Sequence, residues 1–263
     1  MTILPTGIPA FRATPKTLRC VQQGPVLHVE LNRPDEGNAV TDDVLDELHE
    51  VLRTQDPSVR VLVLSGAGED FCLGGDRSEF GDHLAHDSSG AGIRASGVRA
   101  RQVCDALSNN PAVTVARVQG RAVGAGFALA LACDLRVGAE NASFRLPELA
   151  LGLPVAWGGL LPRLINEVGP ARVREIVLSG RAVEAREAFD LSILQRIVPA
   201  GELDEAVAAW VRPVLRRPAA AVRVTRTLLQ AYGSAARQGD LSFLDAELMS
   251  GVLSQAHLAA RER

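Results

Sequence analysis

Phe71-Cys72-Leu73-Gly74-Gly75-Asp76 and Gly120-Arg121-Ala122-Val123-Gly124-Ala125-Gly126 are two glycine-bearing stretches, and each follows an apolar run typical of a strand. The preceding runs are Val59–Ser65 and Val113–Val118, both rich in β-branched residues. After the second stretch comes Phe127–Cys133, which is wholly apolar and compatible with a helix. The order strand, glycine loop, helix therefore occurs here and favours a layered α/β fold.

Both stretches interrupt apolar segments where backbone N–H groups can point outward. Ala125 is expected at or near a helix N-terminus, where unpaired N–H groups and the helix dipole favour a negative charge. Leu73 lies just past a strand end. Together the two stretches would supply two donors of an oxyanion hole for a catalyst that generates an enolate. A plain tight turn is the alternative interpretation of a Gly-x-Gly run.

The composition excludes several classes of protein. The chain has 263 residues, 47% of them hydrophobic, which is enough for one substantial core. A net charge of -3 gives no reason to expect nucleic acid or an anionic membrane as a partner. The longest uncharged apolar stretch, Ala122–Cys133, is too short to span a bilayer, and Met1–Lys16 lacks the apolar core of a secretory signal. We therefore expect a cytoplasmic protein.

Four cysteines are widely spaced along the chain and lack the paired spacing of a zinc site: Cys20, Cys72, Cys104 and Cys133. They are expected to be buried free thiols, which fits a reducing compartment.

The N-terminal half shows clear local signals. Thr17–Gln23 and Pro25–Asn32 form a predicted hairpin with its turn at Gln23-Gly24. A helix is expected to begin near Thr41, which can cap it. Its apolar stripe consists of Val44, Leu45, Leu48, Val51 and Leu52. Asp134–Ala139 and Ser143–Leu146 are further predicted strands.

Arg77–Gly97, between the two glycine stretches, is rich in Ser, Gly, Asp and His and has little apolar periodicity. We interpret it as a mobile loop that could cover a site. His83 and His86 lie there with Asp82 and Asp87, a spacing that also occurs in metal sites. Because no further ligand cluster converges on them, a solvated polar loop is the preferred interpretation, and no metal is predicted.

From Gly201 onward only helices are expected: Glu202–Leu215, Ala219–Tyr232 and Asp240 to about Ala260. We place a boundary near residue 200, with a core in 1–200 and a helical segment for subunit contact in 201–263.

A series of motifs extends over nearly the whole chain. They are Leu31-Asn32-Arg33-Pro34 with Asn38-Ala39, Ser65–Asp76, Gln119–Asp134, Phe144–Glu148, Leu151-Gly152, Leu178–Arg181, Val198-Pro199 and Pro218–Leu229. In this order and spacing the chain resembles the crotonase superfamily, the enoyl-CoA hydratase/isomerase group. The resemblance implies a spiral of β-β-α repeats, C-terminal helices that build a homotrimer or a dimer of trimers, and an acyl-CoA thioester as substrate. It implies no separate cofactor, since CoA arrives as part of the thioester.

The resemblance also suggests roles for individual residues. It assigns the two oxyanion donors to the backbone N–H groups of Leu73 and Ala125. Backbone around four further positions would line the CoA pocket: Asn38, Ala39, Gly75 and Asp76. Arg226 matches a basic position that could approach the CoA phosphates, although a solvated helix face also explains an arginine there.

The acidic residues limit which of the family's reactions the chain can catalyse. Hydratases of this family use two glutamates, and here Ala128 matches the first and Glu148 the second. A methyl group cannot orient or deprotonate water, so the pattern favours an enoyl-CoA isomerase in which Glu148 moves a proton between carbons of the substrate. The resemblance leaves three alternatives open: a hydratase or hydratase-lyase, a decarboxylase or C–C bond-forming enzyme acting through a CoA enolate, and a non-catalytic acyl-CoA-binding scaffold. A helix-start acid after Pro147 is the structural alternative for Glu148.

Overall fold

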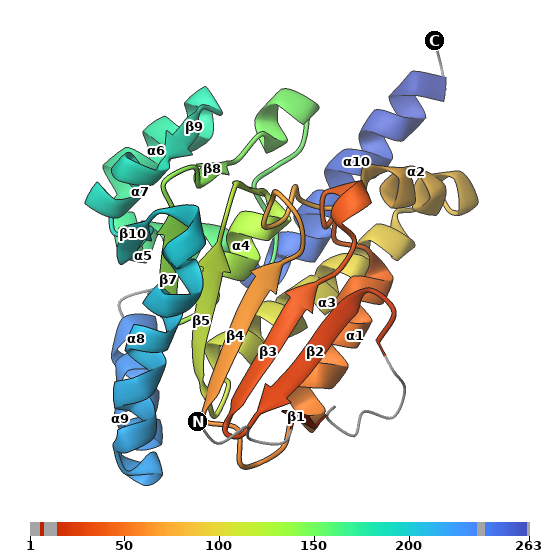
Figure 1. Ribbon diagram of the computed structural model, residues 1–263. Coiled ribbons are helices and arrows are strands. Elements are labelled where there is room, and N and C mark those ends of the chain that lie inside the picture. The colour runs from red at the N-terminus through yellow and green to blue at the C-terminus, as the bar shows by residue number, and fades with distance from the viewer. Residues whose placement is uncertain (1–5, 8–14, 236–239, 262–263) are drawn as a thin grey trace.

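The structure, a computed structural model, describes residues 6–7, 15–235 and 240–261. One mixed sheet of seven strands dominates this part of the chain, in the order β1-β2-β3-β4-β5-β7-β10 (Figure 1). Its strands are β1 (Thr6–Gly7), β2 (Leu18–Gln23), β3 (Val26–Leu31), β4 (Val61–Gly66), β5 (Val113–Val118), β7 (Leu135–Ala139) and β10 (Arg196–Val198). The predicted β2–β3 hairpin is confirmed, and every pairing from β3 to β10 is parallel.

A smaller sheet lies beside the carboxyl ends of the parallel strands. It contains β6 (Arg121–Val123), β8 (Ser143–Arg145) and β9 (Ala182–Glu184). Two isolated bridges, Cys72 with Ala122 and Val40 with Gly75, connect the segment after β4 to this sheet and to the residues before the first helix. The first glycine stretch, Phe71–Asp76, is thus paired with β6 on one side and with Val40 on the other.

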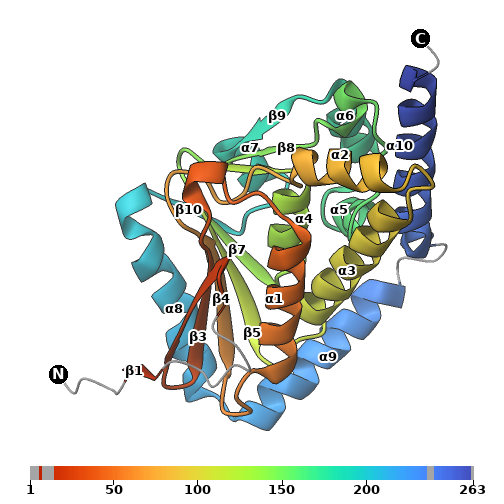
Figure 2. The same ribbon diagram turned by 90° about the vertical axis from the view of Figure 1, so that its right-hand side faces the viewer.

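Helices cover both faces of the large sheet (Figure 2). α1 (Asp42–Thr54), α3 (Ala91–Ser108) and α4 (Ala125–Leu131) pack on one face, and α8 (Leu203–Arg216) packs on the other. Alternation along β4 explains the two cores, because Leu62 and Leu64 face the first layer while Val61 and Val63 face α8. The hydrophobic run of β4 is therefore buried on both sides, as parallel strands require.

α1 follows the predicted pattern. Thr41 precedes it, and its Oγ1 accepts a hydrogen bond from Val44 N at 3.2 Å. All five residues of the predicted stripe are buried.

The prediction of a mobile loop over Arg77–Gly97 is wrong, since this region forms α2 (Arg77–His86) and the start of α3. Two of its glycines serve close packing: a Cβ at Gly97 would lie 2.8 Å from Ala246 Cβ, and a Cβ at Gly92 would lie 2.6 Å from His83 Nδ1. These glycines therefore mark helix contacts, where the sequence pattern suggested flexibility.

The second half of the chain is mainly helical. Its helices are α5 (Leu160–Val168), α6 (Pro170–Ser179), α7 (Ala185–Asp190), α8, α9 (Ala219–Ala235) and α10 (Asp245–Arg261), with 3-10 turns at η1 (Pro34–Glu36), η2 (Glu148–Leu151), η3 (Ala200–Glu202) and η4 (Ser242–Leu244). α10 begins at Asp245 and not at Asp240, because the turn η4 precedes it. α8 lies beyond residue 200 but shares the apolar core beneath the large sheet. The boundary near residue 200 between a core and a helical segment stays a prediction.

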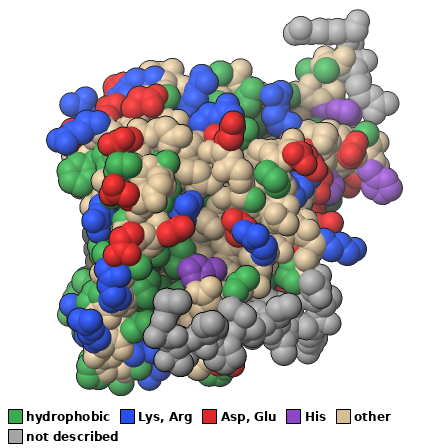
Figure 3. All heavy atoms as spheres, viewed as in Figure 1, with side chains coloured by type: hydrophobic (Ala, Val, Ile, Leu, Met, Phe, Trp, Pro, Cys, Tyr) green, Lys and Arg blue, Asp and Glu red, His purple; other side chains and the backbone are tan. Residues whose placement is uncertain are grey.

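The surface carries no large patch of one charge on the face drawn in Figure 3, where arginines and acidic side chains alternate. Within the described ranges, no helix has the length and apolarity needed to cross a bilayer. All four cysteines are free and buried, and burial raises the pKa of each thiol to about 12.

Candidate active site

The segment after β4 determines which backbone N–H groups are available to a ligand. The Cys72 carbonyl accepts from Val123 N at 2.9 Å, and on the opposite side the Leu73 N–H donates to the Gly37 carbonyl at 2.9 Å. An N–H that already donates within the chain is not available to a substrate oxygen. The assignment of Leu73 as an oxyanion donor is therefore wrong, because its amide faces Gly37.

Gly75 supplies the amide that Leu73 does not. Gly74 has φ of +107°, a conformation that glycine adopts at little cost, and its carbonyl accepts from Val40 N at 2.8 Å. The peptide is trans, so the Gly75 N–H points away from Val40. Among the hydrogen bonds of the described backbone, Gly75 N donates none. The Gly74-Gly75 pair is the sequence signal that could have identified this donor, because a glycine with positive φ can reverse the direction of the following N–H group.

Ala125 is the first residue of α4, as predicted, and its N–H is one of those that a helix leaves without an intrahelical partner. Gly126 lies directly against the first stretch: a Cβ there would sit 2.3 Å from the Cys72 carbonyl oxygen. This close approach brings the α4 N-terminus next to the segment that carries Gly75.

Glu148 lies at the start of η2, just after β8. Its residue is only 9% exposed, and Oε2 has no hydrogen-bond partner among the described groups. Burial raises the pKa of this carboxyl from 4.5 to about 7, opposed in part by a backbone hydrogen bond. Oε1 lies 2.9 Å from where a Cβ of Gly124 would stand, directly before Ala125. A buried carboxyl with a raised pKa beside a helix N-terminus is an arrangement typical of functional sites, so this placement favours a chemical role.

The position that the resemblance gives to a first glutamate carries a buried methyl group. Ala128 is 1% exposed, and its neighbour Phe127 packs on Phe144 with ring centroids 4.9 Å apart. The wall beside the α4 N-terminus is therefore apolar.

The residues predicted to line the CoA pocket have structural tasks of their own. Asn38, buried and with φ of +53°, donates from Nδ2 to the carbonyls of Ala67 and Asp70 and accepts from Arg33 N. Asp76 caps α2 by accepting from Ser78 N and Glu79 N. The carbonyl of Ala39 accepts from Arg33 Nη1 at 2.8 Å. That backbone around these residues lines a CoA pocket stays a prediction.

The guanidinium of Arg226 is engaged inside the chain, which argues against its assignment to the CoA phosphates. The residue is buried, and its guanidinium donates to Asp134 Oδ2 at 2.6 Å and to the carbonyls of Ser108 and Asn110. Asp134 follows the end of α4 and Ala125 begins it, so on the order of 10 Å of helix separates them. Arg226 therefore anchors α9 to the end of α3.

We expect Arg226→Ala to lower the free energy of unfolding by about 3 kcal/mol, because it leaves buried carbonyls and a carboxylate without their donor. Urea unfolding measures this loss. Arg223→Ala, on the exposed side of the same helix, is the matched control and should change stability by less than about 0.5 kcal/mol. Weaker CoA binding by R226A at unchanged stability would contradict the anchoring role.

A family model described as enoyl-CoA hydratase/isomerase matches residues 21–259. The chain belongs to the enoyl-CoA hydratase/isomerase family. It is 38% identical over 192 residues to a carnitinyl-CoA dehydratase of Proteus mirabilis, covering 72% of this chain and 70% of that one. It is 38% identical over 211 residues to a mevalonyl-coenzyme A hydratase of Beauveria bassiana, covering 76% and 74%.

Solved structures show the same architecture. A protein of Thermobifida fusca, solved with acetoacetyl-CoA, superposes with a TM-score of 0.76 at 31% identity, covering 93% of this chain and 95% of that chain. An enoyl-CoA hydratase from Mycobacterium avium subsp. paratuberculosis gives a TM-score of 0.78 at 26% identity, covering 93% and 96%. The fold predicted from the resemblance, the crotonase fold with a helical C-terminal region, is confirmed.

Proposed function

We propose that this protein binds an acyl-CoA thioester with its carbonyl oxygen between the N–H groups of Gly75 and Ala125, and that Glu148 transfers a proton at the neighbouring carbon. The observation that carries the proposal is the buried, unpartnered carboxyl of Glu148 beside Gly124, next to the first amide of α4. Two amides aimed at one oxygen stabilise the negative charge of an enolate, and each is worth about 3 kcal/mol of barrier.

Acyl-CoA as the substrate is supported by the family and by the acetoacetyl-CoA bound to the Thermobifida fusca relative. In this proposal CoA is a part of the substrate and the protein needs no separate cofactor.

Isomerisation of a 3-enoyl thioester suits a single carboxylate. Glu148 would take a proton from the α-carbon, the charge would spread into a dienolate held by the two amides, and the same carboxyl would return the proton to the γ-carbon. No water is consumed. The buried methyl group of Ala128 supports this choice over hydration, because a second carboxylate is absent from that position.

Hydration or dehydration is the second candidate. It is favoured by the names of the relatives, a carnitinyl-CoA dehydratase and a mevalonyl-coenzyme A hydratase. A single glutamate would then have to activate the water and protonate the α-carbon in turn.

Exchange of α-protons into deuterated water, followed by product identification, tests the proposal on saturated, 2-enoyl and 3-enoyl thioesters. Migration of the double bond in 3-enoyl substrates supports isomerisation, and rapid gain of water by 2-enoyl substrates with inert 3-enoyl ones supports hydration. Loss of carbon dioxide or a new C–C bond would indicate the other enolate reactions. No exchange with any thioester, together with tight CoA binding, would indicate a scaffold.

The activity should rise with pH and reach half its maximum near pH 7. The carboxylate of Glu148 is the base, and burial raises its pKa to about 7, so below that pH most molecules carry the unreactive protonated form. The pH dependence of kcat/KM for isomerisation measures this. A profile that stays flat between about pH 5 and 9 would exclude Glu148 as the base.

We also propose a homotrimer or a dimer of trimers. Exposed apolar side chains on η4, α9 and α10 support it, among them Leu229, Tyr232 and Phe243, which are 68%, 74% and 68% exposed. Light scattering in solution tests this directly.

A further inference from the structure

α2 directly follows Gly75 and Asp76, and apolar packing holds it weakly. Among the described residues of α2, Leu84 is the one that is buried, and it packs with Ile93 and Met249. Phe80 is half-buried and lies over the candidate donor: a Cβ at Gly75 would stand 3.2 Å from its Cζ. The position of α2 therefore bears on the surroundings of the Gly75 amide.

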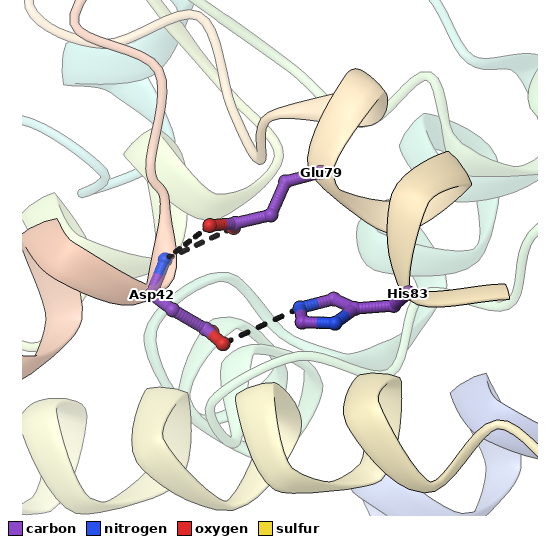
Figure 4. A group of neighbouring side chains, drawn as sticks. All are labelled: Asp42, Glu79 and His83. Atoms are coloured by element: carbon purple, nitrogen blue, oxygen red, sulfur yellow. Dashed lines mark hydrogen bonds and ion pairs between the residues drawn. The ribbon is translucent and has the colours of Figure 1, made fainter. Parts of the chain in front are cut away.

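Polar contacts fasten α2 to the start of α1 (Figure 4). The carboxylate of Glu79 accepts from Asp42 N at 3.2 and 3.0 Å, which satisfies an N–H that α1 leaves unpaired at its first turn. One turn further along α2, His83 Nε2 lies 3.3 Å from Asp42 Oδ2. Glu79, a residue of α2, thus caps the N-terminus of α1.

The oxygens and the imidazole of this cluster lie within 4.8 Å of one another, as metal ligands do. Arg99 Nη1 already donates to Asp42 Oδ2 at 3.1 Å, and its Nε lies 3.0 Å from Asp46 Oδ1. Because a guanidinium supplies the positive charge, we interpret the cluster as a polar network: Arg99 of α3 forms ion pairs with the acids of α1, and Glu79 joins α2 to α1 through hydrogen bonds from Asp42 N.

The same end of α1 also positions the Gly75 amide. Val40, two residues before Asp42, donates to the Gly74 carbonyl and accepts from Asp76 N at 2.9 Å. The first bond orients the Gly74–Gly75 peptide and the second orients the Gly75–Asp76 peptide, while Phe80 of α2 lies against Gly75. The hydrogen bonds of Val40 and the attachment of α2 to Asp42 therefore both depend on the segment from Val40 to Asp42.

We propose that Glu79 and His83 are positioning residues: by locking α2 to the first turn of α1, they keep the Gly75 N–H aimed at the thioester oxygen. This inference rests on the proposed function, since it concerns the same oxyanion site. Small displacements of such a donor are costly, because misplacement by about 1 Å can lower a rate roughly 100-fold.

The carbonyl vibration of a bound saturated acyl-CoA, isotopically labelled at the thioester carbonyl, reports the hydrogen bonds to that oxygen without requiring turnover. In the unaltered protein the band should shift to lower frequency on binding. Glu79→Ala should lose most of that shift and lower the rate of α-proton exchange about tenfold, with KM and CoA affinity changed less than about twofold. Glu79→Gln should restore much of the shift, because its amide oxygen can still accept from Asp42 N–H.

Asp82→Ala is the matched control, since Asp82 is an exposed acid on the same helix. If Glu79→Ala does not fold, His83→Ala serves instead, with an expected rate loss of about threefold and His86→Ala as its control. A full band shift and full rate in the folded Glu79 and His83 variants would overturn the inference and leave the proposed function intact. Absence of a shift in the unaltered protein would overturn the proposed function itself, and the positioning role with it.

Discussion

Replacing Glu148 by glutamine should reduce turnover by a factor of about 100 to 10,000. The amide has nearly the same shape as the carboxyl but cannot accept the α-proton, so the site keeps its form and loses its base. CoA affinity should stay within about twofold of the original, because the side chain lies beside Gly124 on the acyl part of the proposed site. Steady-state kinetics and calorimetric titration with CoA measure the two effects.

The same substitution should stabilise the protein above pH 7. Since burial raises the Glu148 pKa from 4.5 to about 7, the folded chain keeps a proton that the unfolded chain releases between these values. Stability contributed by this group therefore falls as pH rises from 4.5 to 7 and stays low above that range. Glu148→Gln removes the loss, which amounts to at most about 3 kcal/mol, and denaturant unfolding at pH 5 and pH 8 detects it. An E148Q variant that is active, or less stable at pH 8, would contradict the role given to this carboxyl.

Gly126→Ala should disrupt both fold and activity. The new Cβ would lie 2.3 Å from the Cys72 carbonyl oxygen and 2.7 Å from Cys72 Cβ, and neither the backbone nor the buried side chain can give way without moving α4. We expect a loss of about 3 kcal/mol in stability. In the fraction that folds, separation of the Ala125 and Gly75 amides should lower turnover roughly 100-fold.

Gly81→Ala is the control for a glycine-to-alanine change. Gly81 lies inside α2, and a Cβ there would meet no atom within 4 Å. This variant should gain up to about 1 kcal/mol, because alanine loses less backbone entropy in a helix. Thermal melts and exchange rates of both variants test the comparison, and equal behaviour of G126A and G81A would refute the close contact with Cys72.

Local patterns predicted those parts of the fold that depend on near neighbours. The cap at Thr41, the apolar stripe of α1 and the β2–β3 hairpin each need only residues a few positions apart, and all three are confirmed. The same reasoning failed for α2 and the start of α3, because Gly92 and Gly97 suggested flexibility but lie against side chains elsewhere in the fold, Gly97 against Ala246 of α10.

The sequence by itself therefore determined the family, the crotonase fold, the two glycine stretches and the candidate carboxyl at Glu148. Only the tertiary structure decided which amide of the first stretch is free, because the partners that engage Leu73 and orient Gly75 are Gly37 and Val40, more than 30 positions earlier. It likewise assigned Arg226 to Asp134, 92 positions away, and raised the Glu148 pKa through burial. The direction of an N–H group and the solvation of a carboxyl depend on what packs beside them, and folding brings those neighbours from elsewhere in the chain.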